Sequence, residues 1–368
     1  MPVFKIKLKS KKERNPRKNN LKVFCDNIIM VHLNNNDTLL RSNIDKVIYD
    51  SIVSKRQIKY KNLSISKQQA DDRKKEMIRF IESLEKLKQI PVIKQRTIEW
   101  LDARKNRLTA SDLGDAIKKN NIKLAKQKAG ITKNSTNFSN VPALKWGTMF
   151  EDMASRCYSQ MKNDIKITEF GLIEDKTNIH FGASPDGINE MGIMLEIKCP
   201  YSRAIKDNFI PEKYYMQIQG QLAVCNLKEC DYVECKFEIY DSIDKYIEDI
   251  VLNHENKKVE HGIIAEYQDA ETNNFKYMYS SAYLNASDAL KDIEKKVSEN
   301  TTQDIFLKLT PWILRTINIQ RVFFDDKLWQ ETVPKINKFW ELVEECKLLP
   351  EEPEVTKKLK FEFITEDD

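Results

Sequence analysis

The spacing of apolar residues divides the chain into a helical N-terminal part and a mixed part that follows it. Apolar residues recur every three or four positions in residues 35–54 and in residues 66–90. That period is typical of amphipathic helices, and Pro91 ends the second of them. The pattern therefore predicts a helical N-terminal region over residues 23–92.

Beyond Pro91, helical periodicity alternates with short runs in which every second residue is apolar. The predicted helices cover residues 97–105, 111–119, 143–161, 211–225 and 326–346. The predicted strands cover residues 165–173, 179–183, 193–199, 231–240 and 317–324. Residues 120–141 are predicted to form a polar connection. Interleaved helices and strands predict an α/β (α+β) fold, with a central mixed β-sheet flanked by helices.

Length and composition limit the class of protein. A chain of 368 residues allows one large domain with appendages or two domains. Charged residues make up 32% and hydrophobic residues 41%, which is typical of globular proteins. No apolar run approaches the ~18 residues of a membrane span, and the first twenty residues lack the apolar core of a signal peptide. We therefore expect an intracellular protein without a membrane segment.

Charge is concentrated at the two ends of the chain, although the net charge is only +5. Residues 1–22 carry nine lysines and arginines against one glutamate, whereas residues 347–368 are acidic. A basic arm of this kind neutralises phosphates, so it predicts nucleic-acid binding. A role in solubility or in nuclear targeting fits the arm equally well. The acidic tail is interpreted as a solvated chain end.

Glycine and cysteine exclude several kinds of site. No GxGxxG follows a predicted strand, and the GxxxxG from Gly182 to Gly187 lacks the lysine of a phosphate-binding loop. Cys225, Cys230 and Cys235 are evenly spaced, but their spacing is not that of a metal-binding CxxC pair. Buried thiols in a reducing compartment are the favoured interpretation, over both a metal cluster and a disulfide framework.

The strongest chemical signal comes directly after the predicted strand 179–183. Asp186 follows Ser-Pro in a turn, and Glu196 comes ten residues later, two residues before Lys198. In an extended strand Glu196 and Lys198 project to one face, and a hairpin would fold Asp186 back beside them. Such hard oxygen ligands suit Mg²⁺ or Mn²⁺, and an ammonium can stabilise charge on a phosphate. The alternative is a surface salt bridge on a hairpin.

The sequence SPDG…LEIKCP resembles the signature of the PD-(D/E)xK nucleases, and within them the lambda-exonuclease-like branch of YqaJ-type viral recombinases, or viral alkaline exonucleases. Further stretches resemble that branch in the same order along the chain. They are WxxxR…TAS in residues 100–111, GxxxE in residues 147–151, YxxQxQ in residues 214–219 and a closing helix in residues 325–345. The resemblance covers about residues 95–345 and implies a restriction-endonuclease-like core.

The resemblance implies a metal site made of three carboxylates. Glu151, Asp186 and Glu196 would hold Mg²⁺, which Mn²⁺ can replace. The Ile197 carbonyl would be a further ligand, and Lys198 would position the attacking water. Taken alone, Glu151 would be expected to face solvent from an amphipathic helix; beside the other two carboxylates, the metal-ligand interpretation is favoured.

The same resemblance assigns supporting roles around this site. Tyr214 and Gln217 lie on one face of the predicted helix 211–225, and Gln217 is implied to act with the catalytic residues. The role of Gln221, on the same face, is left open. Ser184 is implied to support the turn before Asp186.

Arg104 and Ser111 are implied to bind a DNA 5′-phosphate. A hydroxyl, an arginine and free backbone N–H groups at a helix start suit a phosphate. Ser111 could equally cap the helix that it opens, and Thr109 with Asp112 forms a candidate capping box. The two interpretations of Ser111 are compatible.

The predicted function is a Mg²⁺-dependent 5′→3′ exodeoxyribonuclease that resects duplex ends in viral or phage recombination, replication or genome processing. The alternatives are an endonuclease of the same fold, acting on DNA or RNA, and a catalytically inactive DNA-binding protein. Expected partners are duplex DNA ends and a single-strand annealing protein, with a monomer and a homotrimer both open. The host cytoplasm, the nucleus and the virion are the expected locations.

The predicted organisation has four parts. They are a basic arm (1–22), the helical region (23–92), the nuclease domain (93–346) and the acidic tail (347–368).

Overall fold

The computed structural model describes residues 67–350, apart from residues 92, 94, 96, 106, 133–140, 255–258 and 283. The basic arm, the predicted helix 35–54 and the acidic tail beyond residue 350 lie outside the described residues. The four-part division of the chain therefore stays a prediction.

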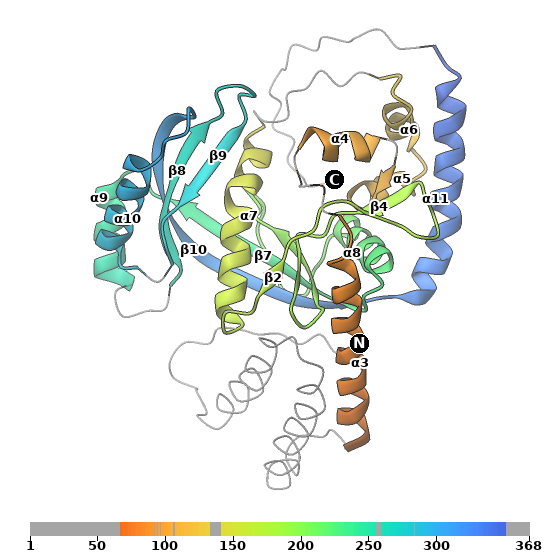
Figure 1. The fold of residues 1–368 in the computed structure, drawn as a ribbon, viewed down its shortest axis with the longest axis horizontal. Helices are drawn as coiled ribbons and strands as arrows, with labels where there is room; N and C mark the ends of the chain where they lie inside the picture. Colours follow the sequence, from red (N-terminus) through yellow and green to blue (C-terminus); the bar gives the residue numbers. More distant parts are fainter. Residues whose placement is uncertain are drawn as a thin grey trace.

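A seven-stranded mixed sheet forms the centre of the molecule (Figure 1). Its strands lie in the order β2 (Ile167–Thr168), β5 (Gly187–Asn189), β6 (Met194–Lys198), β7 (Glu229–Ile239), β10 (Ile305–Phe323), β8 (His261–Gln268) and β9 (Phe275–Tyr279). Strands β6 and β7 pair in parallel, and the other neighbours pair antiparallel. A three-stranded sheet has the order β1 (Leu108–Thr109), β4 (Phe181–Ala183) and β3 (Ile173–Glu174).

Helices cover both faces of the seven-stranded sheet. Helix α7 (Pro142–Met161) packs its apolar side chains on one face, in a core shared with β6, β7 and β10. Helix α8 (Glu212–Cys225) packs on the other face, in a second core shared with β4 and with α11 (Asp326–Lys347). The predicted mixed sheet flanked by helices is therefore confirmed.

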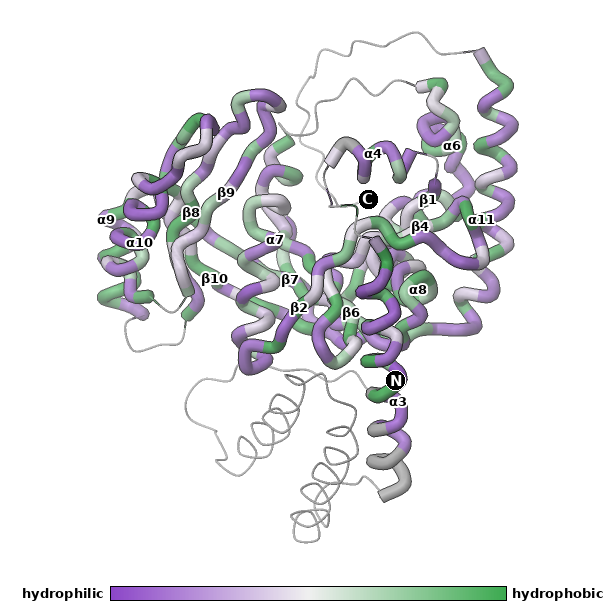
Figure 2. The backbone as a smooth tube through the Cα atoms, viewed as in Figure 1, coloured by the Kyte–Doolittle hydropathy of each residue, from purple (hydrophilic) through white to green (hydrophobic). Residues whose placement is uncertain are grey.

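The remaining helices lie around this centre. They are α3 (Lys67–Leu87), α4 (Ile98–Lys105), the 3₁₀ turn η2 (Ala110–Asp112), α5 (Leu113–Ala116), α6 (Ile122–Lys128), α9 (Ile243–Asp249), the π-helical turn η4 (Ile250–His254) and α10 (Ala286–Ser298). Figure 2 shows hydrophilic and hydrophobic residues mixed along α10 and α11, as expected of helices with one buried face. Among the described helices, none is long and apolar enough to cross a membrane.

Residues 165–173 do not form the single strand that their pattern predicts. Strand β2 pairs with β5, whereas β3 pairs with β4 in the other sheet. Gly171 lies between them, and a Cβ atom there would lie only 1.9 Å from the Ile93 carbonyl oxygen. Only glycine permits so close an approach of two backbone segments.

Three other predicted segments also differ from the structure. The predicted polar connection 120–141 contains α6, which buries Ala125 completely and packs against α11. Residues 111–119 form only η2 and the four-residue helix α5. The predicted strand 317–324 is the end of the much longer β10, because residues 245–316, where no element was predicted, supply β8, β9 and the start of β10. Three of the seven residues of α6 are lysines, so the short apolar face of this helix is hard to recognise in the sequence.

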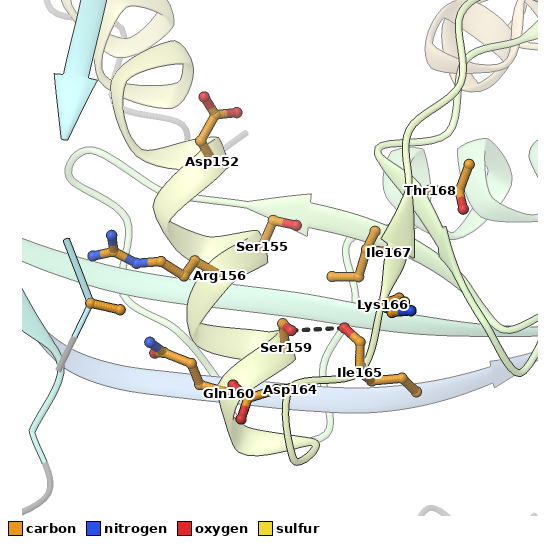
Figure 3. A pocket seen from close by; sticks show the side chains of 11 residues that line it. Asp152, Ser155, Arg156, Ser159, Gln160, Asp164, Ile165, Lys166, Ile167 and Thr168 are labelled. Atoms are coloured by element: carbon orange, nitrogen blue, oxygen red, sulfur yellow. Dashed lines mark hydrogen bonds between the residues drawn. The ribbon is translucent and has the colours of Figure 1, made fainter. Parts of the chain in front are cut away.

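A surface hollow of about 650 Å³ lies beside α7 and β2 (Figure 3). Its lining carries both signs of charge, from Asp152, Arg156, Asp164 and Lys166. Because none of the predicted site residues lines this hollow, it is separate from the predicted active site.

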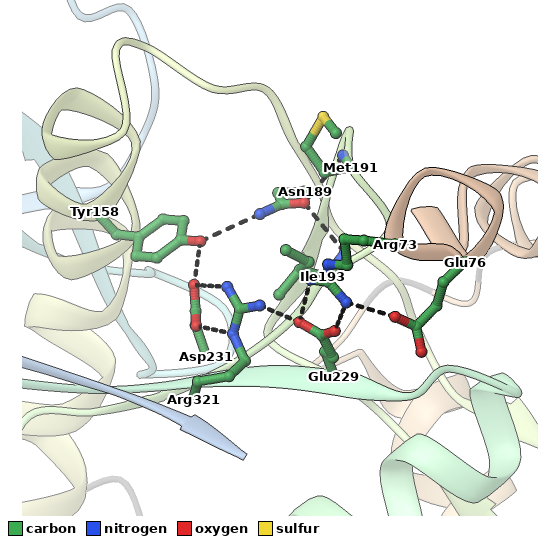
Figure 4. Close-up of polar contacts among 9 residues, drawn as sticks. All are labelled: Arg73, Glu76, Tyr158, Asn189, Met191, Ile193, Glu229, Asp231 and Arg321. Atoms are coloured by element: carbon green, nitrogen blue, oxygen red, sulfur yellow. Dashed lines mark hydrogen bonds and ion pairs between the residues drawn. The ribbon is translucent and has the colours of Figure 1, made fainter. Parts of the chain in front are cut away.

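A buried ionic network joins α3 to two strands of the central sheet (Figure 4). Arg321 of β10 lies directly opposite Asp231 of β7 and donates to it, with Nε 2.6 Å from Oδ1. Arg321 also contacts Glu229, to which Arg73 of α3 donates at 2.9 Å. Tyr158 of α7 donates to Asp231 at 2.8 Å. Both carboxylates are buried, so the two arginines provide the positive charge that neutralises them.

Replacing Arg321 with methionine should destabilise the protein by about 3 kcal/mol. The substitution leaves two buried carboxylates without one of their two cations, and removing one partner of a buried ion pair is far more costly than removing the whole pair. Urea unfolding measures the change. The control is Lys347→Met, which removes an exposed pair with Glu344 and should cost less than about 0.5 kcal/mol. Equal losses in the two variants would contradict the role assigned to this network.

Candidate active site

The turn that contains Asp186 leads into β5, and β5 pairs with β6, the strand that carries Glu196 and Lys198. Asp186 Oδ2 accepts a hydrogen bond from the backbone N–H of Ile197, with the two heavy atoms 2.7 Å apart. The predicted hairpin therefore forms, and this bond holds the aspartate beside β6.

Successive residues of β6 point to opposite faces of the sheet. Leu195 and Ile197 pack in the core under α7, whereas Met194 packs in the core under α8. Glu196 lies on the α8 side with Lys198, whose Nζ contacts Glu196 Oε1. The predicted arrangement of a carboxylate and an ammonium on one face of the strand is observed.

Glu196 is bound through both of its carboxylate oxygens. Lys198 occupies Oε1, and the Gln221 side-chain amide donates to Oε2 at 2.8 Å. Glu196 is completely buried, but the Lys198 side chain is 25% exposed. The Lys198 ammonium also lies 5.0 Å from the centre of the Tyr214 ring. The lysine therefore joins the buried carboxylate to the surface.

Burial and neighbouring charges shift the pKa values of Asp186 and Lys198. Burial, followed by the negative charges of Glu196 and Glu151, raises the pKa of Asp186 well above its usual range. Burial alone would lower the pKa of Lys198, but Glu196 and Asp186 outweigh it, and the lysine pKa is raised. Lys198 is therefore a permanently charged donor at neutral pH.

Glu151 reaches the same place from α7. Burial is the largest cause of the raised pKa of the neighbouring Cys199 thiol, and the charges of Glu151 and Asp186 raise it further. Because Glu151 and Glu196 both raise the pKa of Asp186, each of these two carboxylates lies near Asp186.

The donor chemistry of these residues suits a hard divalent cation, since carboxylate oxygens are its preferred ligands and mutual repulsion would be relieved by it. In the described ranges, however, no three acidic, histidine or cysteine side chains are gathered closely enough to hold a metal ion. The two carboxylate oxygens of Glu196 contact Lys198 and Gln221. The residue types at this place fit a divalent cation.

Arg104 and Ser111 also meet, as predicted. The Arg104 guanidinium donates to Ser111 Oγ at 3.1 Å and to Thr109 Oγ1 at 3.2 Å, and it stacks on Trp100 at 4.1 Å. Burial lowers the pKa of Arg104, against the charge of Asp112. A partly desolvated guanidinium beside two hydroxyls is a suitable phosphate site.

The predicted capping box is wrong. Thr109 is the residue before η2, but its side chain makes no hydrogen bond to the backbone there. Its hydroxyl donates instead to the Asp112 carboxylate at 2.9 Å, and Lys128 lies 2.9 Å from the same carboxylate. Asp112 is drawn to these two donors, so the hydroxyls of Thr109 and Ser111 face the arginine.

One hydrogen bond joins the arginine cluster to the carboxylate site. The Trp100 indole N–H donates to Ser184 Oγ at 3.1 Å, and Ser184 lies two residues before Asp186. Trp100 is also the ring on which Arg104 stacks. Trp100 therefore contacts residues of both predicted sites. The supporting role of Ser184 stays a prediction.

Sequence reasoning missed two of the groups nearest to Glu196 and Lys198. Gln221, whose role was left open, contacts the carboxylate, while the role predicted for Gln217 one turn earlier stays a prediction. Glu234 lies directly opposite Lys198 on β7, is completely buried and pairs with Arg203 at 2.7 Å. Glu234 is one of several charged residues of β7, so the sequence does not distinguish it. The Ile197 carbonyl as a metal ligand likewise stays a prediction.

Comparison with known families supports the resemblance that the motifs indicate. Residues 99–228 match the sequence model described as the YqaJ-like viral recombinase domain. That segment contains Arg104, Ser111, Glu151 and the whole Asp186–Lys198 hairpin. The family resemblance is thus confirmed over these residues.

Three known proteins are similar to longer parts of the chain. An uncharacterized protein of Acanthamoeba polyphaga mimivirus is 26% identical over 301 residues, which are 71% of this chain, and the chain spans 54% of that relative's length. The structure of an alkaline exonuclease from Laribacter hongkongensis is 22% identical, with a TM-score of 0.40 over 68% of this chain and 95% of its own. A phage-related exonuclease from Haemophilus somnus is 10% identical, with a TM-score of 0.36 over 66% of this chain and 93% of its own.

Replacing Asp186 with asparagine should stabilise the metal-free protein at neutral pH. The raised pKa means that the folded state holds this proton more tightly than the unfolded chain does. Stability is therefore lost as the pH rises from the unfolded aspartate value of about 3.9 through the folded one. Asparagine has no charge to bury, so this loss of stability disappears, and its side-chain oxygen can still accept a hydrogen bond from the Ile197 N–H. Thermal unfolding in a chelator, from pH 3 to pH 8, measures the difference.

The gain should shrink as the pH falls and vanish below about pH 4, where aspartate is protonated in both states. Asp152→Asn, which changes an exposed carboxylate of α7, should show no such trend. A midpoint lower than that of the unmodified protein throughout the pH range would show that Asp186 is held in a favourable, ionised form.

Proposed function

We propose that this chain, whose residues 99–228 match a viral recombinase domain, is a metal-dependent deoxyribonuclease that degrades duplex DNA from its 5′ ends. The observation that supports it most is the convergence of Asp186, Glu196 and Lys198 on the paired strands β5 and β6. Acidic oxygen ligands beside an ammonium supply the groups that phosphodiester hydrolysis requires.

The carboxylates of Glu151, Asp186 and Glu196 are the residues that would hold Mg²⁺ or, in its place, Mn²⁺. When bound, such an ion polarises the phosphate and makes water a stronger nucleophile at neutral pH. Lys198 stays charged, so it acts as a donor that orients the attacking water and stabilises negative charge on the phosphate, not as a base. Its position is fixed by Glu196 on one side and by the Tyr214 ring on the other.

The 5′ polarity of the proposal rests on the arginine cluster. Arg104, Thr109 and Ser111 offer a guanidinium and two hydroxyls to a terminal phosphate. The contact between Trp100 and Ser184 sets the separation of this phosphate site from the carboxylates. A phosphate bound at one end would therefore place a nearby phosphodiester at the other.

The product of such a reaction is a duplex end with a 3′ single strand. A strand of this kind is the substrate of a single-strand annealing protein, which we propose as the functional partner in recombination, replication or genome processing of a virus or phage. The name of the matched domain family supports this setting.

Lys198→Met should lower kcat on linear duplex DNA by about 10²–10³-fold, the usual effect of removing one donor to a developing charge. Methionine fills the same space on the α8 side of β6 but leaves the buried Glu196 without its cation, so the thermal midpoint is also measured and kcat is compared for folded protein. The assay compares 5′- and 3′-labelled duplexes with and without Mg²⁺. Lys295→Met, an exposed lysine of α10, is the control and should cleave normally. Turnover near normal in the Lys198 variant would remove the role assigned to this lysine.

The protein should degrade a 5′-phosphorylated duplex about tenfold or more faster than a 5′-hydroxyl duplex. A charge-assisted bond between arginine and phosphate is worth about 1.5–3 kcal/mol in a partly desolvated pocket. Arg104→Ala should reduce this preference rather than slow both substrates equally. Rates on duplexes that differ only at the 5′ terminus measure it. Closed circular DNA cut as fast as linear duplex would instead support an endonuclease.

A further inference from the structure

Helix α8 carries three buried glutamines, and two of them, Gln219 and Gln221, point their amides at different parts of the molecule. The Gln219 amide accepts from the backbone N–H of Asp325 at 2.8 Å and donates to the Phe323 carbonyl at 3.0 Å. Both of its polar ends are therefore used to fasten the end of β10 to α8. The amide of Gln221, two residues later, is directed at the active site.

Gln221 joins β6, which carries Glu196, to the turn that carries Asp186. Its Nε2 donates to Glu196 Oε2 on β6 at 2.8 Å, and it also lies 3.4 Å from the Ser184 carbonyl oxygen before β5. Since Glu196 is completely buried, Gln221 and Lys198 are the donors that set the orientation of its carboxylate. The same amide therefore contacts both Glu196 and the turn that contains Asp186.

The other end of the Gln221 amide is not used by the scaffold. Its Oε1 is buried and accepts no hydrogen bond from any residue that the structure describes. Gln221 itself is only 1% exposed. A buried acceptor without a partner is unfavourable for folding alone, which points to a purpose in the site. It is free to accept from a donor that enters beside Glu196.

We propose that Gln221 is a positioning residue of the active site, which fixes the Glu196 carboxylate relative to the Asp186 turn for binding of a divalent cation. This inference rests on the proposed nuclease function. Residues that orient metal ligands commonly change metal affinity or activity by 10–100-fold when they are lost. Because Gln221 acts through Glu196, its loss should weaken cation binding and lower kcat, but leave DNA binding unchanged.

The experiment compares Gln221→Met with Gln219→Met, two substitutions of the same shape on the same helix. Three quantities are measured on each protein: the thermal midpoint, Mn²⁺ affinity by calorimetry without DNA, and kcat and KM on 5′-phosphorylated duplex. Gln221→Met should weaken Mn²⁺ binding and lower kcat by roughly 10–100-fold each, with KM unchanged. Gln219→Met should lower the thermal midpoint and leave Mn²⁺ affinity and kcat of the folded protein unchanged.

A second variant, Gln221→Asn, covers the case in which Gln221→Met fails to fold. It keeps an amide but draws it back by one methylene, so it should show the same loss of Mn²⁺ affinity with less disturbance of the core. Normal Mn²⁺ affinity and kcat in a folded Gln221 variant would overturn the proposal, as would equal losses in Gln219→Met. If the unmodified protein binds Mn²⁺ but cleaves no DNA, the nuclease proposal fails, while the Mn²⁺ measurement still decides the role of Gln221.

Discussion

The hydrogen bond from the Ile197 N–H to the Asp186 carboxylate is the contact on which the candidate site depends. It joins the Asp186 side chain in the turn to the backbone of β6, eleven residues further along the chain. The result is a buried carboxylate beside Glu196 and within the field of Glu151. Such an accumulation of like charge opposes folding, and Lys198 and Gln221 relieve only part of it. The site is thus electrostatically unsatisfied in a way that a bound cation would correct.

The site draws its residues from both helical layers of the fold. Glu151 comes from α7, Gln221 from α8, and the hairpin of Asp186 and Glu196 lies in the sheet between them. The indole of Trp100 adds a third element, since it contacts Ser184 on one side and Arg104 on the other. Relative movement of α4, α7 and α8 would therefore misalign the proposed phosphate pocket and carboxylates together.

The sequence predicts well those features that depend on neighbours in the chain. The hairpin around Asp186 and the alternation along β6 follow from local spacing, and the structure has them. The placement of Arg104 beside Ser111 follows from the family resemblance, and the two side chains are in contact. Features set by distant segments are not predictable in this way. An example is the close approach of the Ile93 backbone to Gly171.

The choice between two glutamines shows the same limit at the site. Gln217 and Gln221 lie on one helical face, so periodicity treats them alike. Which of them reaches Glu196 depends on how far along the strand α8 packs, and that is decided by the core beneath it. The pairing of Arg73 with Glu229 is likewise invisible in the sequence, because 156 residues separate the two partners.

The parallel pairing of β6 and β7 has a consequence for the evolution and handling of this domain. The segment that matches the recombinase family ends at residue 228, one residue before β7 begins. A fragment cut at that point would keep every residue of the signature but leave β6 as an open strand edge, which is a template for aggregation. Residues 99–228 therefore do not form a unit that can be transferred on its own. The smallest unit that could be exchanged between proteins, or expressed alone, must extend through β10, because β7 in turn needs β10 as its other neighbour.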